Sequence, residues 1–352
     1  MGKEKVTIYT IAEELNMTPS MVSRAFKPDG KVNEKKRQLI LETAERMGFE
    51  QNRMASRLSM KPIRIATLIY GRFPGYYDEM VRGVEAASRD LSDYKVTNRL
   101  FVMPFGEYSQ EDAFRVLDEV EADKYDGLVL HGLYGEDVAQ RIDRLTDAGV
   151  VVCTLHNDIL SCRRLFTSMS DTELTGSMAA QLLSIFLPPN RNRMVLFSGS
   201  MKSMVHQTLS FSFIRHAEER GMTLLRHYAT EDYPERAAEQ VRDAFETYSG
   251  IDGIYISSAN SAPILRYLEE NRLGDRVAVV ASDVFQELSA YMRKGIVNAT
   301  IYQDPYRQGK RAFEGMFYYI ADGIKPNSYL MTPPQIVMTS NLSVYERWKN
   351  DD

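Results

Sequence analysis

Side chains that suit the binding of hydroxyl groups stand at the ends of three hydrophobic runs of this 352-residue chain. His131 ends the run GLVLH, His156 follows VVCTL, and Asp283 follows VAVVAS. Two histidines at successive strand ends are expected to face one crevice. A buried carboxylate is costly unless it accepts hydrogen bonds, so Asp283 either caps the next helix or accepts ligand hydroxyls. These residue types predict a polar binding site where strands end.

Two more polar residues follow His156 directly. Asn157 and Asp158 offer both donors and acceptors to hydroxyl groups. Arg164 is close enough in sequence to pair with Asp158, either to direct it toward a ligand or for a purely structural reason. We expect Asn157 and Asp158 to contribute to the binding site.

Aromatic and amide side chains extend this candidate site. Tyr76 and Tyr77 begin the helix after the first strand, where they either stack on the C–H faces of a sugar or pack within the fold. Gln303 ends the run VNATIYQ and can donate and accept hydrogen bonds at once. The set predicts a ligand rich in hydroxyl groups.

Enzymatic functions find little support in the motifs. The sequence contains no GxxxxGK[ST], GxGxxG, HExxH, GxSxG or paired CxxC pattern, and its two cysteines are Cys153 and Cys162. Asp158, Asp283 and the two histidines could transfer protons, but a hydroxyl-binding pocket uses the same residue types. We therefore predict a protein that is not an enzyme, with no catalytic residue, cofactor or metal. An α/β sugar enzyme with a fused DNA-binding head remains the remote alternative, and ligand turnover separates the two.

The elements that must position these residues alternate regularly. Strands are expected at 63–70, 96–104, 126–132, 150–156, 193–199, 253–257, 277–282 and 297–303, with helices near 78–92, 109–121, 136–148, 173–186, 205–220, 233–248, 261–271, 285–294 and 306–321. Such alternation predicts parallel sheets covered on both faces, and its length predicts two α/β lobes. Ligands of such folds bind at the carboxyl ends of strands, here between the lobes.

A different pattern precedes this body. Residues 1–61 carry 12 basic and 8 acidic side chains, whereas the chain as a whole has a net charge of −5. In VTIYTIAEELNMTPSMVSRAF, two short helices are separated by a tight turn, with Thr18 as N-cap and Pro19 at the first helical position. Ser20, Ser23 and Arg24 lie on the outer face of the second helix. A basic helix-turn-helix predicts DNA binding, with Arg24 able to donate to guanine; the alternative is a protein-interaction module.

The segments after this motif complete the head. A third helix begins after Asn33 and ends at Gly48. The segment 50–61 has too few apolar residues for a stable isolated helix and is expected to fold when something pairs with it. Leu58 could wedge between base steps in the minor groove, or could simply pack.

The quoted motif, together with KVNEKKRQLILETAERMGF and NRMASRLSM, resembles the DNA-binding head and hinge of the LacI family of bacterial transcription regulators. The resemblance implies that Pro19, Ser20 and Arg24 contact major-groove bases and that Ala55 and Leu58 enter the minor groove. Pro19 departs from the larger residue usual in the family. The predicted DNA-binding set is Thr18, Pro19, Ser20, Ser23, Arg24, Asn52, Ala55 and Leu58.

The body resembles the type I periplasmic sugar-binding fold of the same family over residues 63–345, most closely in 156–183, 279–285 and 301–316. Relatives usually carry an arginine where this chain has Leu209, with Gln207 nearby, and an asparagine where it has Ser258. The usual charged clamp is thus expected to be absent, which leaves a sugar, polyol or nucleoside-like effector open. The predicted effector-binding set is Tyr76, Tyr77, His131, His156, Asn157, Asp158, Gln207, Ser258, Asp283 and Gln303.

The organisation that follows is an α/β protein with an all-α head. We predict a DNA-binding domain at 1–49, a hinge at 50–61 and an effector domain at 62–345, with one lobe at about 62–157 and 304–332 and the other at about 158–303 and 333–345. The partners implied are a pseudo-palindromic DNA operator, a small effector and a second copy of the chain. Without an export signal or a run of 18 apolar residues, the chain is expected to be cytoplasmic. We expect a repressor released by an inducer, the alternative being a regulator with a nucleoside- or purine-like corepressor.

Overall fold

A computed structural model describes residues 6–26, 30–49, 61–71, 74–104, 107–133 and 135–346. The predicted hinge contacts of Asn52, Ala55 and Leu58 lie outside these residues. No helix within the described ranges is both long enough and apolar enough to cross a membrane.

The head is a bundle of three short helices, α1 (Ile8–Glu14), α2 (Pro19–Ala25) and α3 (Glu34–Met47). Its core consists of Ile11, Ala12, Val22, Ala25, Ile40 and Ala44. The residues predicted to begin and end these helices do so. The Thr18 hydroxyl accepts from the Met21 backbone N–H, and Gly48 ends α3 with a φ of +70°.

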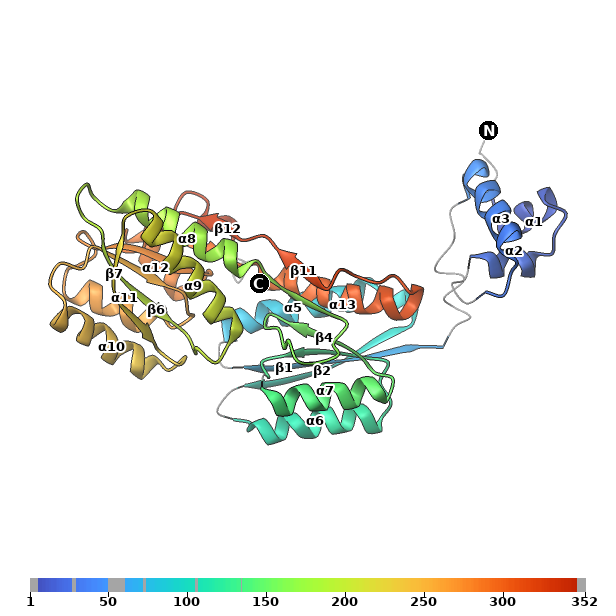
Figure 1. The fold of residues 1–352 in the computed structure, drawn as a ribbon, viewed down its shortest axis with the longest axis horizontal. Coiled ribbons are helices and arrows are strands. Elements are labelled where there is room, and N and C mark those ends of the chain that lie inside the picture. Colours follow the sequence, from blue (N-terminus) through green and yellow to red (C-terminus); the bar gives the residue numbers. More distant parts are fainter. Residues whose placement is uncertain are drawn as a thin grey trace.

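The first lobe of the body is built on a six-stranded parallel sheet. Its strands in spatial order are β11 (Tyr329–Thr332), β5 (Phe166–Ser170), β4 (Val151–Leu155), β3 (Gly127–His131), β1 (Ile63–Gly71) and β2 (Val96–Pro104). Figure 1 shows α6 (Gln110–Ala122) and α7 (Glu136–Asp147) on one face, and α5 (Pro74–Asp90) and α13 (Pro305–Asp322) on the other. Alternate residues of β1 serve the two cores, with Leu68 facing α6 and α7 and Ile69 facing α5 and α13.

The second lobe repeats this plan. Its strands in spatial order are β12 (Gln335–Val337), β10 (Ala299–Tyr302), β9 (Ala278–Ser282), β8 (Gly253–Ile256), β6 (Arg193–Ser198) and β7 (Thr223–Ala229), with only β12 antiparallel. One core packs α8 (Thr172–Phe186) and α9 (Met204–Glu219) on the sheet, and the other packs α10 (Pro234–Thr247), α11 (Ser261–Glu270) and α12 (Gln286–Arg293). Two short 3₁₀ turns occur at Ser92–Tyr94 and Leu342–Val344. The predicted two-lobed parallel α/β class is confirmed.

The chain passes between the lobes three times, between β5 and α8, between β10 and α13, and between β11 and β12. The predicted lobe boundary at 157/158 was wrong, because β5 pairs with β4 and β11 in the first sheet. The first passage therefore comes after Ser170. The cause is the composition of β5: FTSMS is short and rich in small polar residues, so its hydrophobic pattern is weak.

Helix pairs within each lobe approach closely at glycines. A Cβ on Gly83 of α5 would lie 2.0 Å from the carbonyl oxygen of Tyr306, and one on Gly176 of α8 would lie 2.5 Å from that of Leu209. Only glycine allows these backbone contacts, so they fix α13 on α5 and α9 on α8.

Candidate functional site

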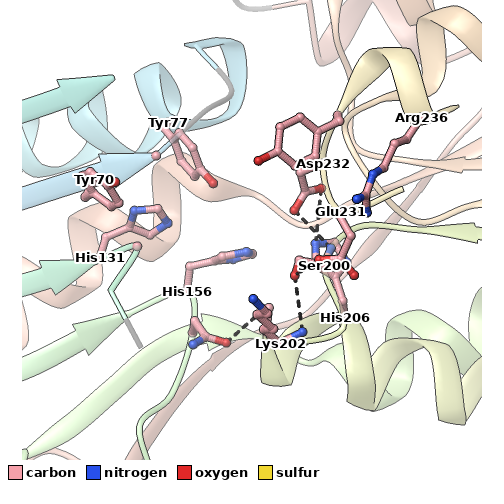
Figure 2. A pocket seen from close by; sticks show the side chains of 15 residues that line it. Tyr70, Tyr77, His131, His156, Ser200, Lys202, His206, Glu231, Asp232 and Arg236 are labelled. Carbon is pink, nitrogen blue, oxygen red and sulfur yellow. Dashed lines mark hydrogen bonds and ion pairs between the residues drawn. The ribbon is translucent and has the colours of Figure 1, made fainter. Parts of the chain in front are cut away.

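A cavity of about 500 Å³ lies between residues of the two lobes, where strands of both sheets end. Figure 2 shows Tyr70, Tyr77, His131 and His156 of the first lobe facing the second lobe across this space. The opposite wall is formed by Ser200, Lys202, Ser203, His206, Glu231, Asp232, Tyr233 and Arg236. We call this cavity the outer chamber. Its volume is within the range usual for small-molecule sites.

A smaller cavity of about 50 Å³ adjoins it, which we call the inner chamber. Tyr77, His156, His206 and Asp232 line both spaces. The inner chamber adds Tyr76, Val205, Leu209, Ser257, Ala259, Asp283 and Gln303. A water molecule needs about 10–15 Å³ of such space, so the inner chamber holds a few water-sized groups.

The two predicted histidines stand side by side in the first lobe. Their ring centroids are 5.8 Å apart, and the His131 ring lies 4.5 Å from that of Tyr77. His156 adopts a φ of +69°, and its Nδ1 is 3.0 Å from the Tyr76 hydroxyl. Burial lowers the pKa of His156 to about 4 and also lowers that of His131. Both imidazoles are therefore neutral near pH 7 and present one donor and one acceptor each.

Asp283 lines the inner chamber on a residue with a φ of +64°. Its carboxylate accepts from the backbone N–H of Gln303 at 3.0 Å and from the Gln303 side-chain amide at 2.8 Å. Burial raises the pKa of Asp283 to about 7. The N-cap of α12 is Phe285 and receives no side-chain hydrogen bond, so Asp283 does not cap that helix. Of the two predicted roles, helix capping is wrong, and Asp283 lies at the inner chamber with its carboxylate bonded to Gln303.

Asn157 lines the outer chamber, but its side chain is hydrogen-bonded to the opposite lobe. Its amide oxygen accepts from the Ser203 hydroxyl at 3.1 Å and from the Val205 backbone N–H at 3.3 Å. Ser203 and Val205 form the start of α9, so a first-lobe side chain caps a second-lobe helix.

Three members of the predicted effector-binding set do not line either chamber. Asp158 is buried and accepts from Arg164 through Nε at 2.5 Å and Nη2 at 2.6 Å, from the Thr167 hydroxyl at 2.7 Å and from the Tyr329 hydroxyl at 2.9 Å. These bonds occupy its carboxylate. The side-chain amide of Gln207 donates to the Met201 carbonyl, and Ser258 is buried beside the lining residues Ser257 and Ala259.

Sequence reasoning missed the charged wall of the outer chamber. Glu231 and Asp232 follow β7, which was not predicted, and His206 lies on α9. The Ser200 hydroxyl donates to Glu231 at 2.6 Å, and the Ser200 N–H donates to Asp232 at 3.1 Å. Leu209 stands in the inner chamber at the position where an arginine was sought, and the charged residues of the outer chamber lie elsewhere, on other segments of the second lobe. The strand-end rule would have found the acidic pair had β7 been recognised.

The DNA-binding candidates of the head share one helix. Ser20 and Arg24 are exposed on α2, as is the capping residue Thr18, while Pro19 and Ser23 are half-buried. The Arg24 Nε donates to the Ser20 carbonyl at 3.2 Å, which leaves its terminal nitrogens at the surface. This face can therefore offer guanidinium and hydroxyl groups to base edges or phosphates. Within the described ranges, no group of three or more His, Cys, Asp and Glu side chains is placed to hold a metal ion.

Comparison with known proteins gives one family match and several distant relatives. Residues 65–324 match the model of the periplasmic binding protein domain. Catabolite control protein A of Priestia megaterium is 23% identical over 335 residues, covering 86% of this chain and 97% of that protein. The HTH-type transcriptional regulator pepR1 of Lactobacillus delbrueckii subsp. lactis is 23% identical over 209 residues, covering 59% of each.

Solved structures show the same architecture. The glucose-galactose binding protein GanP of Geobacillus stearothermophilus superposes with a TM-score of 0.73 at 20% identity, covering 80% of this chain and 99% of that one. At this identity the likeness establishes the fold of the body alone.

Proposed function

Because the chain belongs to the periplasmic binding protein domain family and is distantly related to LacI-family regulators, we propose that it is a transcriptional regulator whose DNA affinity is set by a small effector. The observation that carries this proposal is the combination within one chain of a basic three-helix head and a two-lobed body with a polar cavity. A protein that only binds a ligand for transport does not need a basic three-helix head, and neither does an enzyme.

The head supports the DNA-binding half of the proposal. Its second helix exposes Arg24 and Ser20 on the face opposite the buried Val22. A helix of seven residues covers only one short half-site. We therefore propose that two copies bind a pseudo-palindromic operator, with α2 in successive major grooves and the hinge segments at the centre.

The chambers support the effector half. Neutral histidines, tyrosine hydroxyls, carboxylates and an amide surround a space large enough for a monosaccharide or a somewhat larger molecule. These groups accept and donate hydrogen bonds at many points, and aromatic rings line one side. We propose a polyhydroxylated metabolite as the effector, held by Tyr76, Tyr77, His131, His156, Asp283 and Gln303.

The connection between the two halves is a change in lobe geometry. Three chain passages join the lobes, so the lobes can close on a ligand as two rigid bodies. Closure shifts the operator-binding equilibrium only if the effector binds one arrangement better than the other. We propose that the effector is an inducer that separates the two hinges on the DNA; a corepressor would produce the opposite sign.

The test uses the full-length protein in two stages. Selection of bound fragments from randomised duplex DNA identifies the operator, and gel shifts then measure operator affinity with and without sugars, polyols and nucleosides. The proposal expects a palindromic consensus and a reversible change in affinity caused by a hydroxyl-rich metabolite that is recovered chemically unchanged. Failure to enrich any sequence contradicts the regulator assignment, and conversion of the metabolite favours an enzyme. Tighter DNA binding on ligand addition contradicts the inducer version alone.

A further inference from the structure

The inner chamber has an unusual charge balance. Its described lining residues include two carboxylates, Asp232 and Asp283, but no lysine or arginine. The basic residues Lys202 and Arg236 line the outer chamber only and are exposed to solvent. Their charges are well hydrated there and offset a buried carboxylate poorly.

Asp283 is the more deeply placed of the two carboxylates, and its side chain takes part in no ion pair within the described part of the chain. It is 7% exposed, and both of its hydrogen bonds come from neutral donors of Gln303. Carboxylates that are this buried are ordinarily paired with a cation or a metal. Burial accordingly raises the pKa of Asp283 to about 7, so the surrounding side chains and backbone compensate its negative charge poorly.

Acceptor atoms in the same chamber lack donors. The side-chain oxygen of Gln303 is buried and receives no hydrogen bond, while the amide nitrogen of the same residue donates to Asp283. The hydroxyl of Ser257 is buried without a partner as well. A bound group with several donors and a positive charge would satisfy Gln303 and offset Asp283 together. An ammonium group has three donors and no acceptor.

We infer, on the basis of the proposed function, that the effector is a primary amine with a polyhydroxylated skeleton, such as an amino sugar, and that its ammonium group occupies the inner chamber beside the Asp283 carboxylate and the side-chain oxygen of Gln303. The size of the chamber supports this assignment. About 50 Å³ admits an ammonium group and an adjoining carbon, while the outer chamber of about 500 Å³ receives the rest of the molecule. His156 and His206 line both spaces and stand where the skeleton would pass from one chamber to the other.

The experiment uses calorimetry on the full-length protein to compare sugars that differ only in the group at one carbon. That group is an amine, an N-acetylated amine or the hydroxyl of the parent hexose. The ligands are D-glucosamine, D-galactosamine and D-mannosamine, each beside its parent hexose and its N-acetyl derivative. At least one amine is expected to bind about tenfold or more tightly than both of its neutral counterparts, because a charge-assisted hydrogen bond in a buried site is worth that much. The same amine is expected to change operator affinity.

Two variants test whether the preference for the amine depends on the charge of Asp283. Asp283→Asn keeps the shape and one of the two hydrogen bonds from Gln303 but removes the charge, so it should abolish the preference for the amine over the parent hexose. Lys202→Ala alters only the outer chamber and should retain that preference. Operator binding without ligand and the thermal midpoint show that each variant is folded.

The outcomes separate this inference from the function it rests on. If a hexose or an N-acetyl sugar binds and shifts operator affinity while its amine does not, the inference is overturned and the regulator assignment stands. If none of the three amines binds although an operator is found, the inference is likewise overturned. An amine preference that survives in Asp283→Asn also overturns it. Absence of any selected operator contradicts the proposed function itself.

Discussion

The side-chain oxygen of Asn157, in the first lobe, accepts a hydrogen bond from the backbone N–H of Val205, in the second lobe, over 3.3 Å. A second bond from Ser203, at 3.1 Å, reaches the same oxygen. The first turn of α9 is thus capped from across the cleft, and the cap exists only while the lobes are close. Part of the free energy that favours the closed arrangement of the lobes therefore does not depend on any ligand.

Replacing Asn157 by Ala should favour the open arrangement. The loss of a helix cap costs about 1 kcal/mol, which corresponds to a several-fold shift in the balance between open and closed lobes. Small-angle scattering of the ligand-free protein should report a larger radius of gyration. Asn157→Asp is the matched control, because a carboxylate at a helix N-terminus retains the acceptor. Equal radii for Asn157→Ala and the unmodified protein would show that the cap does not hold the lobes together.

The raised pKa of Asp283 predicts a pH dependence of stability with a definite sign. Between about pH 4 and 7 the folded state holds a proton on Asp283 that the unfolded state has lost, so this residue contributes less stability as the pH rises. The pKa of His156 is lowered to about 4 by burial, and its contribution changes in the opposite direction. Denaturant unfolding of the protein and of Asp283→Asn across this range isolates the carboxyl group. The difference in unfolding free energy should change by on the order of 1 kcal/mol per pH unit, and a flat difference would contradict the assigned pKa.

Asp158 should matter for stability and not for ligand binding. Burial alone would raise its pKa, but hydrogen bonds from Arg164, Thr167 and Tyr329 lower it to about 2. Asp158→Ala leaves the Arg164 guanidinium, whose side chain is 13% exposed, without its carboxylate and should cost roughly 3–5 kcal/mol of unfolding free energy. The protein should lose this contribution on acidification from about pH 4 to 2.

The control for Asp158 removes both charges. Asp158→Asn combined with Arg164→Met should be more stable than Asp158→Ala, because no unpaired charge remains buried. Effector affinity, measured well below the unfolding transition, should be unchanged in either variant. A large loss of affinity would return Asp158 to the binding site.

Arg24→Ala should abolish selective operator binding while leaving the body unaffected. A bidentate contact between an arginine and a guanine contributes about 1–3 kcal/mol of discrimination, and two copies act on a palindrome. Gel shifts should therefore show a loss of about tenfold or more for the selected sequence relative to random duplex. Arg46→Ala is the matched control, since Arg46 is also exposed but lies near the end of α3 and pairs with Glu14. Equal losses in the two variants would point to general charge rather than base recognition.

Long hydrophobic strands and amphipathic helices made most of the fold predictable. The run IRIATLIY lies in a strand buried on both faces, and His131, His156 and Asp283 end or directly follow such strands, so the composition of the strands marks these positions clearly. The edge strand β7, TLLRHYA, mixes polar and apolar residues because one side of it has no neighbour. Missing β7 removed Glu231 and Asp232 from the predicted site.

The direction of a side chain was harder to predict than its position in the sequence. Asn157 and Asp158 both follow β4, yet one points across the cleft and the other into a network with Arg164 and Tyr329. Tyr329 lies far away in sequence on β11, and no local pattern reveals that it meets Asp158. His206 was missed because the position sought on its helix, Leu209, is one turn further along.

The place of β11 and α13 has a consequence for how the chain folds during synthesis. The first sheet lacks its outer strand, and α5 lacks its packing partner, until residues 305–332 leave the ribosome. By then the whole of 171–303 has been made, so the first lobe waits, partly uncovered, for a segment translated after most of the second lobe. Premature termination between about residues 303 and 332 should therefore damage both lobes, because the first would lack β11 and the second would lack β12, and such fragments would be targets for chaperones and proteases.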